Sequence, residues 1–525
     1  MQKKIPFEHI YFWTLVVLSM SMPLSPFMMS ICQFVLLGNW LLEGNFAEKW
    51  HTIKTRKGLL IFLTIYLVHL IWLFNSSDLN YAFKDLRIKL PLLILPLIIA
   101  TSKPLKEFKL NILLNCFTGA VFITTLISTA VLYQWIDKPI TDRRDISLFI
   151  SHIRFSLLIV LVIVIQSYRV LHSMPKLKKI HFLYLALIIW FLIFLMWLQG
   201  LTGLVVLAIS VFILLIIYLR KIKYTFLKVG LTLFVCALPT FIILYLIVAV
   251  QKYYEVDQVN KSKLPLTTLN GNPYLHNTLN KSIENGHYIW LFVCDKELEK
   301  EWDKRSAYKY WGVDRKKQLL RCTLMRYLTS KGLPKDSSGI AALSDKDIKN
   351  VESGLANFLF ARKGIYPRIH EVIGEFDGYF KHGYVNGASV IQRILYLKMS
   401  YEIIKENFWF GTGTGDVEQV FKNKYLGKYS YIQEPFRHRA HNQWVTFFIS
   451  FGIFGFLWEI FAFFYPVFIE KKRKNFYFLA FFLIALLSFL NEDTIETQAG
   501  VTFFAYFYSL FLFGYSLDSN DKPSS

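Results

Sequence analysis

SVIQRILYLKMSYEIIKENFWFGTGTGDVEQVFKNKYLGKYSYIQEPFRHRAHNQWVTFFISFGIFGF (residues 389–456) is the stretch on which the fold of this chain depends. Apolar residues recur in its first part at steps of four and three, which predicts an amphipathic helix over residues 389–406. Arg393 lies within the first turns of that helix. The predicted apolar face consists of Val390, Ile394, Leu397, Tyr401 and Ile404.

A glycine-rich loop follows this helix. Gly411, Gly413 and Gly415 alternate with threonine, and glycine permits tight turns and close approach of backbones. We predict a glycine hinge over residues 411–415. A nucleotide site is weakly supported, because no Gly-Lys-Ser/Thr follows and the Rossmann spacing is absent.

A basic cluster, Arg437-His438-Arg439-Ala440-His441-Asn442, stands directly before the apolar run of residues 444–469. Guanidinium groups at the mouth of a membrane helix suit a phosphate or pyrophosphate carried by a lipid. A histidine at a membrane interface is often only a hydrogen-bonded anchor. His441 lies beside Arg439 and Asn442, which favours a role for His441 in an active site. Arg437 and His438 read more readily as a solvated rim, with Arg437 kept as a reserve phosphate ligand.

The composition indicates a membrane protein. Of 525 residues, 54% are hydrophobic, which exceeds the share of about 45–50% in soluble domains. The apolar runs are long enough to span a bilayer, so the predicted fold class is an all-α polytopic membrane protein. The net charge of +22 is explained by basic cytoplasmic loops and anionic lipids rather than by nucleic acid.

We predict about twelve spans, nine of them in a bundle over residues 1–250 and three over 443–516. Residues 251–442 between them form a large, mainly helical outside domain, and residues 517–525 form a disordered tail. Cys294 and Cys322 both lie in the outside domain, and their spacing leaves a disulfide open. The predicted spans are residues 8–23, 26–43, 58–74, 88–101, 109–134, 152–168, 181–198, 201–219, 228–250, 443–469, 475–490 and 500–516.

Several motifs together resemble the O-antigen ligase and O-antigen polymerase superfamily. They are an arginine before Gly-x-Gly-x-Gly, a His-Asn pair opening a helix that contains Gly452-Ile453-Phe454-Gly455, and the late segment NEDTIETQAG, residues 491–500. The resemblance implies an inverting, metal-independent glycosyltransferase of the bacterial inner membrane, without a cofactor, whose active site faces the periplasm in lipopolysaccharide biosynthesis. Its donor would be a glycan on undecaprenyl pyrophosphate, and its acceptor a hydroxyl, most readily of a lipid A core sugar.

The resemblance also implies roles for individual residues. His441 would be the base, and Arg393 would bind pyrophosphate, with Asn442, His152 and the glycines of the loop in support. Many relatives carry an arginine in a Ser-Arg pair at the outer start of a span, but residues 199–204, QGLTGL, contain none. We therefore propose that Arg154 takes the place of this family arginine. Arg439 and Arg437 are further candidate ligands of the pyrophosphate. Glu492, Asp493 and Glu496 would orient the arginines or the acceptor, although such loop charges are more often simply solvated.

Other functions stay open at this stage. An O-antigen polymerase or a protein O-glycosyltransferase of the same superfamily would use the same donor with another acceptor. A lipid-glycan flippase or transporter belongs to a different class and is expected to show repeated halves and charged helices at mid-membrane. This chain has no evident repeat, and its spans read as nearly free of charge. Apart from the lipid-linked donor, the acceptor and membrane lipids, the sequence indicates no partner.

The first prediction concerns topology. Five basic segments fall on the same side when the N-terminus is cytoplasmic, so both termini should be inside and residues 251–442 outside. Reporter fusions after Lys228 and after Lys335 should therefore give opposite signals. Equal signals from the two fusions would contradict the arrangement of spans. The five segments contain Lys49/Lys54/Arg56/Lys57, Lys103/Lys106/Lys109, Arg169/Lys176/Lys178/Lys179, Arg220/Lys221/Lys223/Lys228 and Lys471/Lys472/Arg473/Lys474.

Overall fold

Helices account for nearly all regular structure in a computed structural model of the chain. The structure describes residues 5–138, 143–173, 178–219, 225–260, 263–362, 364–470 and 475–515. The tail predicted at 517–525 lies outside these ranges, as do some basic residues of the predicted inside loops. The prediction of a mainly helical chain is confirmed.

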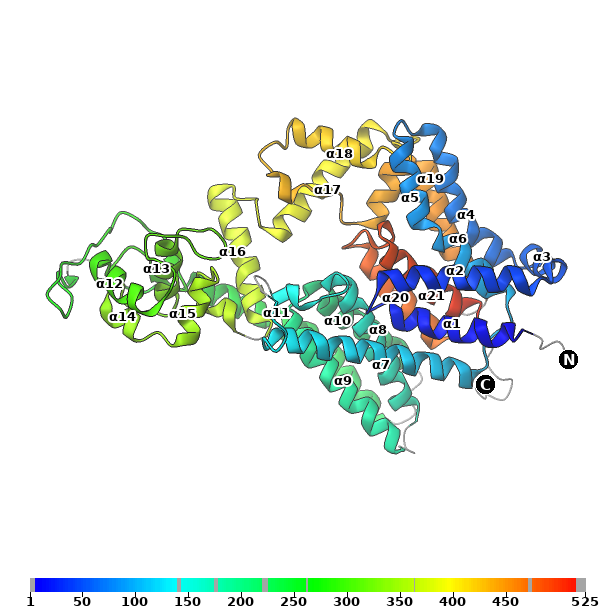
Figure 1. Cartoon of the computed structure of the whole chain (residues 1–525), viewed down its shortest axis with the longest axis horizontal. Helices are drawn as coiled ribbons and strands as arrows, with labels where there is room; N and C mark the ends of the chain where they lie inside the picture. The colour runs from blue at the N-terminus through cyan, green and yellow to red at the C-terminus, as the bar shows by residue number, and fades with distance from the viewer. Residues whose placement is uncertain are drawn as a thin grey trace. The chain divides into compact units, whose positions relative to one another are not determined.

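The chain divides into two compact units (Figure 1). Unit 1 contains residues 1–138, 146–223 and 382–525, and unit 2 contains residues 139–145 and 224–381. The described elements of unit 1 are α1 (Phe7–Ser21), α2 (Pro26–Glu43), α3 (Phe46–Thr55), α4 (Lys57–Ile71), η1 (Trp72–Asn75), α5 (Leu79–Lys89), α6 (Pro91–Thr101), α7 (Glu107–Leu132), α8 (His152–His172), α9 (Lys179–Leu198), α10 (Leu201–Leu219), α17 (Ser389–Glu406), α18 (Val417–Leu426), η5 (Glu434–Phe436), α19 (Gln443–Ile469), α20 (Phe476–Phe489), η7 (Thr494–Glu496) and α21 (Gln498–Leu512). Unit 2 contains α11 (Thr225–Tyr254), β1 (Ile283–Glu284), β2 (His287–Tyr288), α12 (Asp295–Arg305), α13 (Leu320–Ser330), α14 (Ser337–Ala341), α15 (Asp345–Glu352), η4 (Phe358–Ala361) and α16 (Tyr366–His382), and η2 (Arg143–Ile146) lies at a border between the units.

Packing boundaries differ from those expected from the sequence. Residues 382–442, which we assigned to the outside domain, pack within the unit that holds most of the predicted spans. The segment over α11, which we assigned to the first bundle, falls in unit 2. The side of the membrane on which each segment lies stays a prediction.

Each predicted span falls on a helix. Among the described residues, seven helical segments are long and apolar enough to cross a membrane, and α20, α21 and most of α10 form shorter apolar helices. This supports a polytopic helical membrane protein, while the span count of about twelve stays a prediction. The seven segments are Pro26–Glu43, Lys57–Asn75, Glu107–Leu132, His152–His172, Lys179–Leu198, Lys228–Tyr254 and Gln443–Ile469.

The centre of unit 1 is α21, which is buried from Gly500 to Leu512. A helix that is apolar on all sides is stable only when other helices surround it. It packs against α6, α20 and α2 (Figure 1). The ring of Tyr508 stacks on Phe62 of α4, with ring centroids 4.4 Å apart. This packing fixes the start of α21 and the acidic segment just before it.

A buried ionisable pair interrupts the apolar packing between α4 and α19. His69 Nδ1 lies 3.8 Å from Glu459 Oε1, and both side chains are almost inaccessible to solvent. The expectation that the spans are nearly free of charged residues therefore has an exception here.

The predicted helix over residues 389–406 is confirmed as α17, but the residues of its predicted apolar face are not the buried ones. The buried side includes Leu395 and Met399 together with polar Gln392 and Ser400. Ile394, Leu397 and Tyr401 from the predicted apolar face are exposed instead. The physical reason is that a helix at a membrane surface can direct some of its apolar residues to lipid while others pack against the protein.

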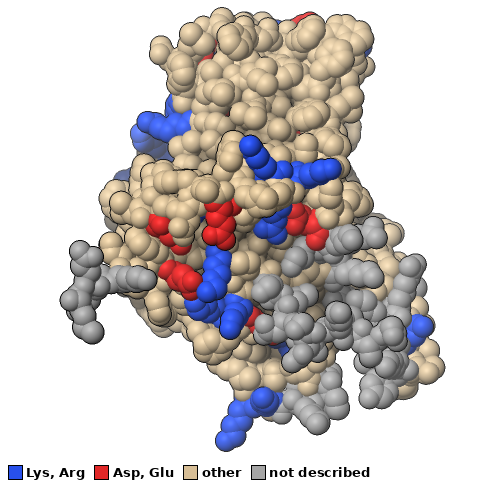
Figure 2. All heavy atoms as spheres, turned by 90° about the vertical axis from the view of Figure 1, so that its right-hand side faces the viewer, with Lys and Arg blue, Asp and Glu red and all other residues tan. Residues whose placement is uncertain are grey.

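Charged side chains are unevenly distributed on the surface. On the face shown in Figure 2, the coloured Lys, Arg, Asp and Glu gather across the middle, and the upper part carries very few of them. A broad area free of charge suits contact with lipid hydrocarbon.

Unit 2 has its own hydrophobic core, built mainly from α12, α13 and α15 around the buried Trp302. A hairpin of β1 and β2 pairs Ile283 with Tyr288 across a turn at Asn285-Gly286. Cys294 and Cys322 are both free thiols, so the disulfide that the sequence left open is absent from the structure.

The glycine loop packs between two other segments of unit 1. An added Cβ at Gly411 would lie 2.4 Å from the carbonyl oxygen of Ser450, and one at Gly413 would lie 2.4 Å from that of Asn75. The loop meets α19 at Gly452, where φ is 61° and the helix is kinked. The close backbone approach expected of these glycines is therefore present, while hinge motion stays a prediction.

We predict that Gly411→Ala destabilises the protein. The new methyl group would clash with backbone atoms, and the φ of +70° at Gly411 is unfavourable for alanine. Strain of this kind costs about 1–3 kcal/mol, so thermal unfolding of the detergent-purified variant should occur at a lower temperature. Gly38→Ala is the matched control, because nothing lies within 4 Å of an added Cβ there. An unchanged unfolding temperature for Gly411→Ala would contradict the packing described.

Candidate active site

The candidate site surrounds the acidic segment between α20 and α21. Glu492 accepts a hydrogen bond from Arg393 Nη2 of α17 at 2.7 Å. Its other oxygen lies 3.7 Å from His441 Nδ1. One buried carboxylate therefore joins the predicted base to the predicted pyrophosphate ligand, although they are 48 positions apart in the chain.

Asp493 fixes the backbone at the start of α19. It accepts hydrogen bonds from the backbone N–H of His441 at 3.2 Å and of Asn442 at 3.1 Å. Thr446 Oγ1 donates a third at 2.7 Å. His441 has a φ of +50°, which is uncommon for a residue other than glycine. Successive N–H groups around a left-handed residue form a concave anion site, so Asp493 stabilises this conformation.

Asn442 caps the N-terminus of α19. Its Oδ1 accepts from Val445 N at 3.1 Å, and its Nδ2 donates to the carbonyl oxygen of Leu490 at 2.9 Å. The cap thus ties the start of α19 to the end of α20. The ring of His441 is held one residue before this cap and lies 5.8 Å from that of Tyr396.

Glu496 is the centre of a second, deeper network. It accepts hydrogen bonds from Lys89 Nζ at 2.9 Å, Arg439 Nη2 at 3.3 Å and Gln443 Nε2 at 2.9 Å. Lys89 also pairs with Asp85 one turn earlier in α5, at 2.6 Å. Arg439 is therefore engaged with the acidic segment through Glu496, as Arg393 is through Glu492, and its binding of pyrophosphate stays a prediction.

The electrostatic environment shifts the pKa values of the three carboxyl groups in different directions. Burial opposes ionisation of Glu492, but His441 and the charges of Arg393 and Arg154 outweigh it and lower the pKa of this carboxyl. Burial likewise opposes ionisation of Glu496, yet Lys89 and Arg439 bring its pKa well below the usual value. Burial raises the pKa of Asp493 despite the nearby Arg439. Glu492 is thus an anion at neutral pH.

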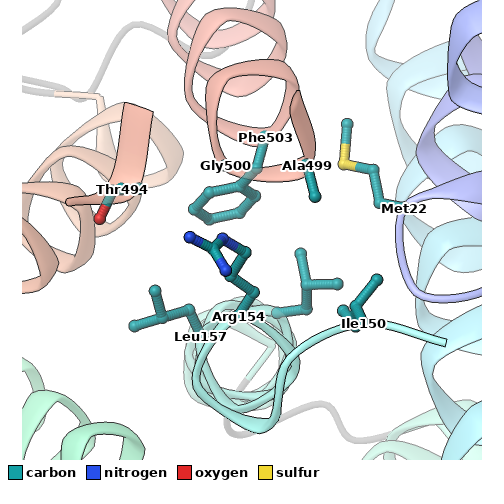
Figure 3. A pocket seen from close by; sticks show the side chains of 9 residues that line it. Met22, Ile150, Arg154, Leu157, Thr494, Ala499, Gly500 and Phe503 are labelled. Atoms are coloured by element: carbon teal, nitrogen blue, oxygen red, sulfur yellow. The ribbon is translucent and has the colours of Figure 1, made fainter. Parts of the chain in front are cut away.

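Arg154 lies in the first turn of α8 and lines a small cavity with Leu157, Gly500 and Phe503 (Figure 3). Its guanidinium group points toward the ring of Phe503, and Nη1 donates to Ser151 Oγ at 3.0 Å. Nε is buried and has no hydrogen-bond partner within the described ranges. Glu492 and Asp493 are close enough to act electrostatically on Arg154. No contact of Arg154 with Arg393 or His441 is seen among the described residues.

Arg437 and the backbone of His438 contact the segment around α18, whereas the ring of His438 lies 5.6 Å from that of His441. Arg437 Nε donates to the carbonyl oxygen of Ile432 at 2.8 Å. The hydroxyl of Tyr425 accepts from the backbone N–H of His438 at 3.1 Å. Burial and the neighbouring His441 lower the pKa of His438. His152 opens α8 two residues before Arg154, and it is half-buried there.

Several residues of the site were not predicted from the sequence. Lys89 and Asp85 were not proposed, although an ionisable pair four residues apart beside an apolar run is a detectable signal. Gln443 gave no such signal, because only its contacts with Glu496 and with the backbone of Ile495 reveal its position. The acidic segment was read more readily as solvated, and this was wrong, since its three carboxyl groups are largely buried.

Comparison with known families bears on the same region. Residues 353–458 match the family model described as O-Antigen ligase. The match contains Arg393, the glycine loop and His441, so the resemblance to the O-antigen ligase and polymerase superfamily is confirmed. No curated protein matches the chain. Together with the apolar helices, the match to O-Antigen ligase supports a multi-pass membrane glycosyltransferase that acts on lipid-linked glycans.

We predict that Glu492→Gln lowers activity without unfolding the protein. Glutamine keeps the shape but removes the charge that attracts Arg393 and His441, and a charged hydrogen bond contributes about 1.5–3 kcal/mol, so transfer should slow by about 10–100-fold. Glycan transfer from a lipid-linked donor is the measurement. Glu402→Gln is the control, because Glu402 lies on α17, as Arg393 does, but pairs with Lys428 outside the site. Equal rates for the two variants would show that Glu492 does not organise the site.

Proposed function

We propose that this protein transfers a glycan from a polyprenyl-pyrophosphate donor to an acceptor hydroxyl at the outer face of a bacterial inner membrane. The observation that carries the proposal is Glu492, which lies between Arg393 and His441. The match to the O-Antigen ligase family over residues 353–458 supports the reaction class. The acceptor favoured here is a lipid A core sugar, as in a ligase.

In the proposed reaction the acceptor hydroxyl oxygen attacks the anomeric carbon of the donor sugar. A new glycosidic bond forms, and the bond from that carbon to the pyrophosphate oxygen breaks. Polyprenyl pyrophosphate leaves with the bonding electron pair, and in-line attack inverts the anomeric centre. His441 takes the hydroxyl proton, because a neutral imidazole is the side chain best matched to this task near neutral pH.

Charge stabilisation is assigned to guanidinium groups. The leaving pyrophosphate gains negative charge as the bond breaks, and arginine can bind two of its oxygens at once without a metal ion. Arg393 is the first candidate, and Arg154 the second, because it is buried with one nitrogen unpartnered among the described residues. Arg439 binds Glu496, and it stays a further candidate together with Arg437.

Glu492 is proposed to act through its neighbours. Its carboxylate would stabilise the imidazolium that forms when His441 takes the proton, as a carboxylate does beside many catalytic histidines. The same anion holds Arg393 at the site before the donor arrives. Asp493 would set the direction of the His441 ring by binding the backbone on both sides of it.

The main prediction concerns His441, Arg393 and Arg154. His441→Ala should lower the transfer rate by about 10²–10⁴-fold through loss of the base. Arg393→Lys keeps the charge but loses the planar fork, so its activity should also fall sharply. Arg154→Ala should be impaired, whereas Arg169→Ala should not be, because Arg169 binds Asn111 and Asn115 near the other end of α8. Rates with purified protein and lipid-linked donor are the measurement.

Two results would contradict this mechanism. Full activity of His441→Ala at normal expression would remove the proposed base. Wild-type activity of Arg154→Ala beside an inactive Arg393→Lys would show that Arg154 does not substitute for the family arginine. Transfer that requires an ion gradient would instead favour the flippase alternative.

The acceptor can be identified from the glycans of a deletion strain. Core without polymer would indicate a ligase, and core with single repeats would indicate a polymerase. Loss of glycan from protein alone would indicate a protein O-glycosyltransferase.

A further inference from the structure

Unit 2 contains a second cavity, of about 250 Å³, which is unrelated to the residues of the candidate active site. It lies between the segment after α11, strand β2 and the loop of residues 332–335. Its size is near the lower end of small-molecule pockets, which span about 300–1,000 Å³. The residues that matter for its chemistry are Asp257, His287, Tyr288, Phe292, Gly332 and Lys335.

The local fold keeps this cavity open. Gly332 has a φ of +69°, and an added Cβ there would lie 3.0 Å from Nε2 of His287. The backbone N–H of Asp257 donates a hydrogen bond to the carbonyl oxygen of Gly286, in the hairpin turn, at 2.9 Å. Glycine at position 332 therefore leaves the imidazole edge uncovered.

The polar groups of the cavity differ in how well they are paired. His287 Nδ1 contacts the carboxylate of Asp257, which orients the imidazole ring. Lys335 is 3% exposed, and its Nζ donates to the carbonyl oxygen of Tyr288 at 2.9 Å. Within the described part of the chain, no carboxylate forms a salt bridge with Lys335. Its neighbour Lys331, by contrast, pairs with Asp347 at 2.8 Å.

An unpaired buried ammonium group is costly, because burial removes its water without supplying an opposite charge. Burial accordingly lowers the pKa of Lys335 to about 8. The group is still largely protonated at neutral pH, and two of its three N–H donors remain available. A ligand with an anionic group would supply the missing charge.

We propose that this cavity binds one sugar residue bearing a carboxylate or phosphate group, with that group against Lys335. The sugar hydroxyls would bind His287 and Asp257, and the apolar ring face would pack on Phe292. The mixture of aromatic and polar lining fits a sugar, which presents both kinds of surface. The acceptor glycan is the proposed source of this sugar, and that assignment rests on the proposed function. The chemistry by which the cavity would bind the sugar does not depend on it.

The test is a binding titration on the full-length protein in detergent. Glucuronic acid and glucose 6-phosphate are the anionic probes, and glucose is the neutral one. Either anionic probe should bind at least tenfold more tightly than glucose. Lys335→Met should remove that preference, whereas Lys304→Met should keep it, because Lys304 is an exposed lysine of the same unit paired with Glu301. Equal binding of all three sugars, or binding of none, would overturn the proposal.

Two further variants make the result interpretable. If Lys335→Met does not fold, His287→Gln serves instead, since it should weaken both anionic probes without removing a buried charge. Unchanged binding by that variant would overturn the proposal. His441→Ala should bind glucuronic acid normally even if glycan transfer is lost, so failure of this cavity and failure of the proposed function give different results.

Binding should also depend on pH. Lys335 loses its proton as the pH rises through about 8, so affinity for glucuronic acid should fall between pH 7.5 and 9, whereas affinity for glucose should not. Asp257, His287 and Tyr288 are the other ionisable groups that line the cavity. An affinity for glucuronic acid that stays constant over this range would contradict the role of Lys335.

Discussion

The burial of three carboxyl groups within five residues is the constraint on which unit 1 depends. Glu492, Asp493 and Glu496 follow α20, where the surrounding helices exclude water from much of their surface. A buried carboxylate is tolerated only when cations or N–H groups satisfy it. Each of the three draws its partners from a different place: α17, the start of α19, and α5 with the basic cluster. Segments distant in the sequence are thereby brought to one site.

The same constraint explains the unusual backbone at His441. A left-handed conformation costs about 1–3 kcal/mol outside glycine, and Asp493 offsets this cost with two hydrogen bonds to consecutive N–H groups. Because α19 begins immediately afterwards, the ring of His441 is placed by the helix as well as by the carboxylate. The placement of the proposed base is therefore a consequence of satisfying a buried anion.

Much of this architecture could be predicted from the sequence, because hydrophobicity and helical periodicity are local signals. The bounds of α17 agree with its prediction at residues 389–406, and the predicted spans fall on helices. The sequence did not predict which side chains are buried, because burial depends on neighbouring segments and on lipid. The exposed side of α17 depends on lipid and neighbouring helices, and the burial of Glu492 depends on partners about 50 to 100 positions away. Arg439 and Arg393 were both predicted as phosphate ligands, and their pairing with Glu496 and Glu492 is visible only in three dimensions.

The orientation of α17 also bears on how a lipid-linked substrate would reach the site. Its outer side exposes Ile394, Leu397 and Tyr401, while Arg393, the residue before Ile394, contacts Glu492 on the protein side. A helix that exposes apolar residues, and whose buried side mixes apolar residues such as Leu395 with polar ones such as Gln392, suits the boundary between lipid headgroups and hydrocarbon. Arg393 on such a helix would lie at the level of the headgroups, where the pyrophosphate of the proposed polyprenyl donor would lie. The donor could then approach Arg393 along the membrane plane, without leaving the bilayer. This route would also explain why Arg393 lies on a surface helix. A membrane-spanning helix would place Arg393 away from the headgroups.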